Sequence, residues 1–121
     1  MNVFDASALL AYLQGEDGAR RVEEALEGGG CCGAANWSEV AQMVLAHRRS
    51  WELARSLLLS FELTTEVVTV DDAEQAARRW RRGDGLSLAD RLCLSLGERL
   101  DADVWTADQT WGSNGRIHQI R

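Results

Sequence analysis

Residues 2–13 read NVFDASALLAYL and contain the first strand and the first helix expected in the chain. The apolar start predicts a short buried strand at residues 2–4, and the apolar repeat that follows predicts a helix over about residues 7–13. Asp5 stands between them, directly after the strand. Ligands bind at the carboxyl ends of the strands in parallel sheets. This stretch therefore predicts an acidic side chain at such an edge.

The rest of the chain continues the alternation of strands and helices. Further strands are predicted at residues 31–35, 65–70, 103–106 and, at the sheet edge, 117–120. Further helices are predicted at about residues 17–27, 36–49, 51–61, 72–82 and 88–100, with a turn or short helix at 108–111. The predicted caps are Asn36, either Asp71 or Asp72, and Ser87. This order predicts an α/β fold around a mostly parallel central sheet.

Length and composition predict one globular domain spanning residues 1–121. A chain of this size buries roughly two-thirds of its extended surface, and 45% hydrophobic with 26% charged residues is ordinary for such domains. No apolar run approaches the roughly 20 residues of a membrane span, and no signal peptide is apparent. The three cysteines form neither a disulfide framework nor a metal knuckle. We expect a cytoplasmic protein with reduced thiols and no membrane partner.

The formal net charge of −6 argues at first against a nucleic-acid partner, because phosphate contacts need cations. Four of the negative charges belong to Asp5, Glu39, Asp90 and Asp108, which are candidate metal ligands for the reasons given below. A bound divalent metal would offset much of their charge. All thirteen basic residues are arginine, which pairs bidentately with phosphate. The charge therefore does not exclude RNA.

Four acids are expected at one edge of the sheet. Asp5 follows the first strand and Asp108 follows the strand at residues 103–106, while Glu39 and Asp90 each stand three residues after a predicted helix cap. Helices that follow parallel strands begin at that same edge. All four carboxylates are therefore candidates for a single cleft.

The same spacings fit helix caps. Asn36-x-x-Glu39 and Ser87-x-x-Asp90 both match the capping box, and Asp5 and Asp108 are placed as strand-end turn residues would be. Two unpaired carboxylates about 5 Å apart repel by about 3 kcal/mol at an effective dielectric constant of 20. A cluster of four therefore requires a cation. Oxygen ligands without histidine or cysteine select Mg²⁺ or Mn²⁺, which suits hydrolysis of phosphodiesters.

Four segments resemble the PIN-domain nucleases, and more narrowly the VapC-type toxins of bacterial toxin–antitoxin pairs. They are residues 3–9 (VFDASAL), 36–40 (NWSEV), 86–91 (LSLADR) and 106–108 (TAD). The resemblance covers nearly the whole chain. It implies a three-layer α/β/α fold and an endoribonuclease that depends on Mg²⁺ or Mn²⁺.

The resemblance also implies roles for particular residues. The metal-binding and catalytic acids would be Asp5, Glu39, Asp90 and Asp108. Ser7 and Thr106 match hydroxyl residues that orient a carboxylate or a metal-bound water, although a helix cap and a strand residue are equally open readings. Some members carry a further acid at the position of Thr110, so one metal or two stays open. Asp71 and Asp72 match no catalytic position and are interpreted as capping residues.

Basic and apolar residues outside this set point to partners. Arg91 is a candidate for contacting a substrate phosphate or for pairing with a neighbouring acid. The arginine run at residues 78–82 is interpreted as a solvated face or an RNA contact, on a helix whose buried face is predicted to comprise Ala73, Ala76, Ala77 and Trp80. Residues 53–59 contain more leucine than the core of a monomer would be expected to bury. The resemblance implies an antitoxin bound in a hydrophobic groove and a homodimer.

Three other functions share features with this sequence. A PIN-type RNA-processing nuclease would keep the chemistry and lack the antitoxin. A signalling receiver domain shares the size, the strand-end acids and Mg²⁺, but it needs an active-site lysine, and this chain has no lysine. A non-catalytic α/β binding module would use the acids only as caps.

Overall fold

The computed structural model describes all of residues 1–121, in which strands and helices alternate. The strands are β1 (Asn2–Phe4), β2 (Gly30–Gly33), β3 (Leu63–Glu66), β4 (Asp103–Thr106) and β5 (Ile117–Gln119). The helices are α1 (Ala6–Gln14), α2 (Ala19–Glu27), α3 (Ala34–Ala46), α4 (Trp51–Leu59), α5 (Val70–Arg79) and α6 (Leu88–Leu100), with a short 3₁₀ turn, η1 (Gln109–Trp111). The predicted α/β fold is confirmed.

All five strands are parallel and lie in the order β3-β2-β1-β4-β5. The chain builds outward from β1 to β3 and then crosses back to add β4 and β5 on the other side of β1. The strand order therefore reverses between β1 and β4, which pair in register at Phe4 and Trp105. Ligands of open α/β sheets bind in the crevice at such a reversal.

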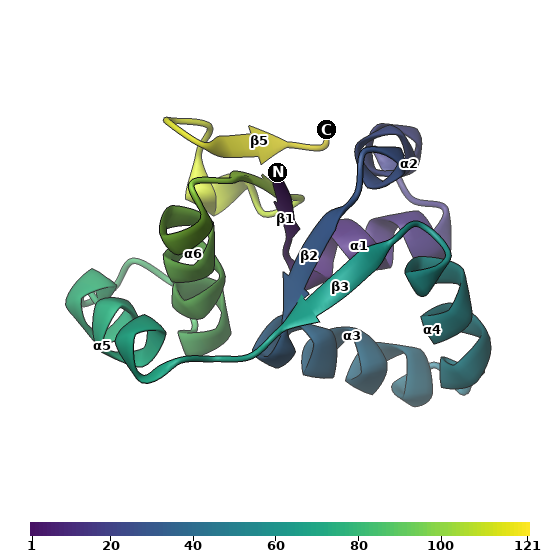
Figure 1. Cartoon of the computed structure of the whole chain (residues 1–121), viewed down its shortest axis with the longest axis horizontal. Coiled ribbons are helices and arrows are strands. Elements are labelled where there is room, and N and C mark those ends of the chain that lie inside the picture. The colour runs from purple at the N-terminus through teal and green to yellow at the C-terminus, as the bar shows by residue number, and fades with distance from the viewer.

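Helices cover both faces of the sheet and give three layers (Figure 1). Adjacent strand residues point to opposite faces. Phe4 accordingly packs in the core shared with α1, α2, α3 and α4, while Val3 packs in the core under α6. Helix α5 lies outside α6 on that second face (Figure 1). None of the helices is long and apolar enough to cross a membrane.

The strand predicted at residues 65–70 lies instead at residues 63–66. β3 ends at Glu66, and Thr69 is already the N-cap of α5. The Thr69 hydroxyl accepts a hydrogen bond from the Asp72 N–H while the Asp72 carboxylate accepts one from the Thr69 N–H. This reciprocal capping box begins the helix within the valine-rich stretch, so Asp72 is the third helical residue and neither it nor Asp71 is the cap.

The predicted cap at Asn36 was also wrong. β2 ends at Gly33, and α3 begins at Ala34, which places Asn36 inside the first helical turn. Ala34 and Ala35 are strong helix formers and extend the helix towards the strand. Asn36 is only 1% exposed and makes tertiary contacts. By contrast, Ser87 does cap α6, with Asp90 completing its capping box as predicted.

The buried face of α5 differs from the one predicted. Ala76 is buried, but Asp72 is buried beside it, and Trp80 is 50% exposed at the end of the helix. Asp72 pairs with Arg99 of α6, and Arg79 pairs with Glu98 of the same helix. Two ion pairs thus dock α5 on α6, which turns Ala73, Ala77 and Trp80 away from the core.

Candidate active site

The four predicted acids line one pocket of about 230 Å³. Asp5 follows β1, Asp108 follows β4, Glu39 lies on α3 and Asp90 lies in the first turn of α6. Ser7 is part of the same wall, and the apolar side is formed by Leu10 and Met43. The pocket opens where the strand order reverses. Four separate elements of the chain therefore bring carboxylates to one place.

Asp5 is the buried member of the set, with 3% of its surface exposed. It caps α1 by accepting the Ala8 N–H at 2.8 Å, and it accepts the hydroxyls of Ser7 at 2.8 Å and Thr106 at 2.6 Å. The pKa of Asp5 is raised to about 6, because the effect of burial and the smaller effect of the Asp90 charge outweigh the lowering by these hydrogen bonds. Asp5 therefore lies in an environment that disfavours its negative charge.

Ser7 and Thr106 connect Asp5 to the segment that carries Asp108. The Ser7 hydroxyl accepts the Ala107 N–H at 2.9 Å, and the Thr106 hydroxyl accepts the Asp108 N–H at 3.0 Å. Ser7 is not a helix cap, since Asp5 has that position. The two hydroxyls hold the carboxyl end of β1 to that of β4 and fix the direction of the Asp5 carboxylate.

Asp90 and Asp108 each use one oxygen to stabilise the start of a helix, Asp90 in the capping box with Ser87 and Asp108 as the N-cap of η1. Asp90 Oδ2 accepts the Ser87 N–H at 2.9 Å. Asp108 Oδ1 accepts both the N–H of Thr110 at 2.9 Å and its hydroxyl at 2.6 Å. The remaining oxygens, Asp90 Oδ1 and Asp108 Oδ2, receive no hydrogen bond from the protein. The capping interpretation of Asp90 is correct, and it leaves an oxygen available to a ligand.

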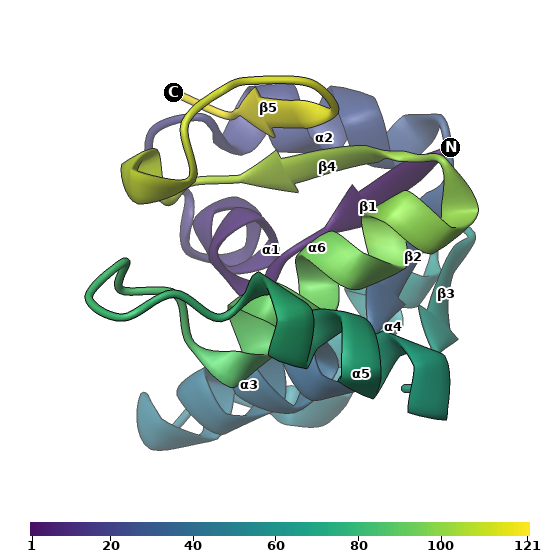
Figure 2. The same cartoon turned by 90° about the vertical axis from the view of Figure 1, so that its left-hand side faces the viewer.

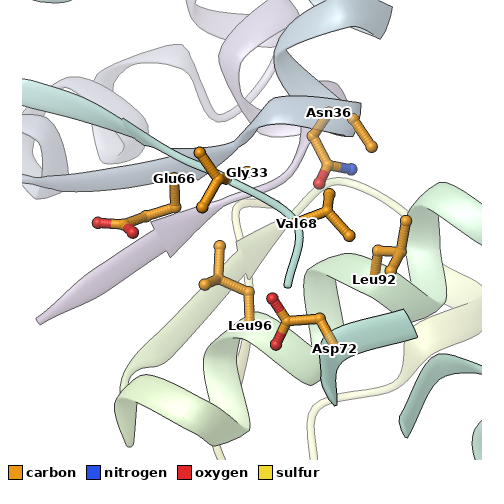
Figure 3. A pocket seen from close by; sticks show the side chains of 9 residues that line it. Gly33, Asn36, Glu66, Val68, Asp72, Leu92 and Leu96 are labelled. Atoms are coloured by element: carbon orange, nitrogen blue, oxygen red, sulfur yellow. The ribbon is translucent and has the colours of Figure 1, made fainter. Parts of the chain in front are cut away.

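Glu39 is held by Asn36, a residue whose role the sequence did not reveal. Asn36 Nδ2 donates to Glu39 Oε1 and to the Ala89 carbonyl, each at 3.3 Å, and Glu39 Oε2 has no protein donor. Burial raises the pKa of Glu39, the Asn36 hydrogen bond opposes this, and the charge of Asp90 adds to it. Figure 3 shows the Asn36 amide directed into the space beside Val68 and Leu92, between α3 and α6. The N-x-x-E spacing was the available signal, but it was interpreted as a cap.

The chemistry of this donor set fits a hard divalent cation. All the donors are carboxylate oxygens, and three of the four acids offer an oxygen free of hydrogen bonds. As the side chains lie, no three acids, histidines or cysteines come close enough together to hold an ion directly. Mg²⁺ usually keeps several waters and binds through one or two carboxylates, so ligands spaced around a pocket suit it.

Arg91 points away from these acids. Its Nη1 donates to the Ala76 carbonyl at 2.8 Å and so ties the first turn of α6 to α5. It does not line the acidic pocket, and its Nε is buried without a partner. Trp111, which closely follows Asp108, is buried in the core under α6 and is a packing residue.

Together, the parallel sheet with its reversal at β1 and β4 and the four acids at that edge define an α/β protein with an acidic pocket at the carboxyl ends of its strands. The family model described as PIN domain matches residues 3–115. The chain belongs to the PIN domain family, whose members are generally nucleases.

A solved structure described as a toxin–antitoxin complex from Klebsiella pneumoniae has a similar fold. The TM-score is 0.78 at 18% sequence identity, and the match covers 100% of this chain and 98% of that chain. At that identity the likeness shows a shared fold. Among curated proteins, none matches the chain.

Proposed function

We propose that residues 1–121 form a single PIN-like nuclease domain that hydrolyses RNA phosphodiester bonds with Mg²⁺ or Mn²⁺, as the toxin of a type II toxin–antitoxin pair. The observation that carries the proposal is the convergence of Asp5, Glu39, Asp90 and Asp108 on one pocket. In a PIN-family chain, that pocket is the natural place for phosphodiester hydrolysis.

The chain's own residues would hold the cation and fix its position. Asp5 lies at the base of the pocket, where Ser7 and Thr106 orient its carboxylate, while Asp90 and Asp108 direct free oxygens from rigid caps. When bound, the divalent metal supplies an activated water and stabilises the leaving oxygen. The acids alone would repel a phosphate, so we expect no cleavage by the metal-free protein.

Cleavage of a mixed RNA pool tests the proposal. Antitoxin-free protein should cut RNA with Mn²⁺ or Mg²⁺ and should not cut it in EDTA. Asp90→Asn is the matched variant, because the asparagine side-chain oxygen can still accept the Ser87 N–H but the side chain loses the ligand charge. Loss of cutting in a folded Asp90→Asn protein supports the proposal. If neither protein cuts RNA and neither binds metal, the acids serve only as caps, and the proposal is contradicted.

An apolar groove beside the pocket supports the antitoxin part of the proposal. A cavity of about 260 Å³ between α1, α3 and α4 is lined by Leu13, Val44, Leu53 and Leu57, with 74% of Leu53 exposed. Val44 follows Met43, which lines the acidic pocket, so α3 contributes a residue to each cavity. We propose that this groove takes an apolar antitoxin segment, a known mode of peptide recognition.

The groove can be tested apart from catalysis. Leu53→Glu should abolish co-purification with the product of the adjacent gene while RNA cleavage persists. Leu45→Glu is the control, because Leu45 is 59% exposed but does not line the groove. If both variants keep the partner, the groove assignment fails.

The proposal includes action in the cytoplasm. It also includes assembly as a homodimer, and light scattering of the purified protein can test that assembly. An RNA-processing nuclease without an antitoxin is the alternative. Metal-dependent cleavage by a protein that binds no adjacent-gene product would favour it.

A further inference from the structure

The end of α5 presents an exposed tryptophan among arginines. Residues 78–82 read RRWRR. The Trp80 side chain is 50% exposed, and the Arg82 guanidinium lies over its ring, 5.5 Å from the centroid. A half-exposed indole that packs in no core is costly to leave in water.

The arginines of this segment are not equivalent. Arg79 is engaged by Glu98 and by the Ser95 hydroxyl. Arg81 donates to the carbonyls of Arg78 and Trp80, each at 2.8 Å, and so terminates the helix. The Arg78 and Arg82 guanidinium groups form no ion pair. In a chain of net charge −6, two arginines without ion-pair partners thus lie on either side of one exposed ring in the sequence.

The segment that carries this surface packs beside the helical turn that carries Asp90. Arg91 donates to the Ala76 carbonyl, so the last turn of α5 adjoins the first turn of α6. That turn carries Asp90, and Trp80 lies one helical turn beyond Ala76. Figure 2 shows the connection from α5 to α6 projecting at the sheet edge where β1 and β4 end. A chain that leaves the pocket over the first turn of α6 would run towards this segment.

We propose that Trp80, Arg78 and Arg82 form a binding surface for single-stranded RNA that flanks the cleaved phosphate. An unpaired base would stack on the Trp80 ring, and the guanidinium groups would contact neighbouring phosphates. Stacking on an aromatic ring combined with cations is how proteins hold single strands with little sequence preference. A duplex keeps its bases stacked inside and cannot use the ring. The inference rests on the proposed ribonuclease function.

The experiment measures binding separately from cleavage. A short fluorescent single-stranded RNA and its duplex are titrated in EDTA with the whole chain, as wild type and as Trp80→Ala, Trp80→Phe, Arg78→Ala/Arg82→Ala and Arg20→Ala/Arg55→Ala. The last variant is the matched control. It also removes two exposed arginines without ion pairs, and they lie on α2 and α4, across the molecule from α5 (Figure 1).

Trp80→Ala should weaken binding of the single strand about tenfold, Trp80→Phe should retain most of it, and neither should change duplex binding. Arg78→Ala/Arg82→Ala should lower the slope of log Kd against log salt concentration by about 1.4, the value for two phosphate contacts to a single strand. Arg20→Ala/Arg55→Ala should change the slope far less.

Several results would overturn the inference. If wild-type protein cuts RNA with Mn²⁺ while the Trp80 and Arg78/Arg82 variants bind and cut normally, this surface does not bind RNA. The proposed nuclease function is then retained. If those variants keep RNA binding but lose the antitoxin, the surface serves a protein instead. If the wild type neither cuts nor binds RNA, the proposed function and the inference both fail.

Discussion

Asn36 places one buried amide between two of the candidate ligands. It donates to Glu39 on its own helix and to the carbonyl of Ala89, the residue before Asp90. Both bonds come from the same nitrogen, and the side chain is nearly inaccessible to water. Asn36 therefore orients the Glu39 carboxylate relative to the first turn of α6, which carries Asp90.

Asn36→Ala should weaken both folding and metal binding. Loss of two bonds in a buried site should lower the free energy of unfolding by about 1–3 kcal/mol. Release of Glu39 should weaken Mn²⁺ binding about tenfold, as is typical when a residue that orients a ligand is removed. Denaturant unfolding and calorimetric titration measure the two effects.

Asn2→Ala is the matched control. The Asn2 amide also donates to two backbone carbonyls, Ala25 and Gly29, but at the opposite end of β1. It should lower stability without changing Mn²⁺ affinity. Equal Mn²⁺ affinity in Asn36→Ala and wild type would make Asn36 a packing residue only.

The Asp72 carboxylate is held in its ionised form by its partners. Burial alone would raise its pKa, but hydrogen bonds with Arg99 and with Thr69 outweigh this and lower the pKa below the ordinary value. A lowered pKa in the folded state means that the ion pair stabilises the fold above the unfolded-state pKa of about 4. That contribution is lost as the pH falls through the folded-state pKa.

Asp72→Asn should therefore destabilise the protein most at neutral pH. The deficit in unfolding free energy relative to wild type should be about 1–3 kcal/mol at neutral pH and should shrink as the pH falls below about 4. Urea unfolding over a pH series measures it. Asp101→Asn, which breaks an exposed pair with Arg116, should show little deficit at any pH. A deficit for Asp72→Asn that does not vary with pH would contradict the assignment.

At the scale of elements, helix α6 lies very close to β4. A Cβ atom added at Gly97 would collide with Val104 Cγ2, and both residues are buried. The absence of a side chain at Gly97 thus sets the separation of the helix from the sheet. Since α6 begins with the capping box that contains Asp90, this packing also sets where that carboxylate stands.

Gly97→Ala should cost about 1–3 kcal/mol of stability through overpacking, and Val104→Ala in the same chain should relieve the collision. A double-mutant cycle from denaturant unfolding should give a favourable coupling of about 1 kcal/mol. Strictly additive effects of the two substitutions would show that α6 does not depend on this contact.

The elements that were predicted correctly are those whose signals are local. The spacing of Ser87 and Asp90 alone predicts the start of α6, and both residues are confirmed as its capping box. The errors occur where tertiary contacts decide. Asn36 was assigned to a cap because its partner, the Ala89 carbonyl, is distant in sequence. Trp80 was assigned to the buried face because the ion pairs that dock α5 on α6 lie across two helices.

At the scale of the whole molecule, the reversal of strand order gathers the acids. Asp5 and Asp108 follow adjacent strands, so parallel topology alone brought them together in prediction. Asp90 and Glu39 required helices that start at the same edge, which the sheet order provides. Which carboxylate oxygens are free was not predictable, because it depends on hydrogen bonds from Thr110, Ser87 and Asn36. Their assignment to metal binding remains the central proposal.

Titration of metal-free protein with Mn²⁺ by calorimetry tests that proposal most directly, since it needs neither RNA nor a partner. The variants are Asp5→Asn, Glu39→Gln, Asp90→Asn and Asp108→Asn, each shown to be folded by circular dichroism. The control is Asp71→Asn, an exposed acid outside the pocket. We predict saturable binding to wild type, weakened at least about tenfold in each pocket variant and unchanged in the control. No binding to wild type, or equal binding to all six proteins, would contradict the account.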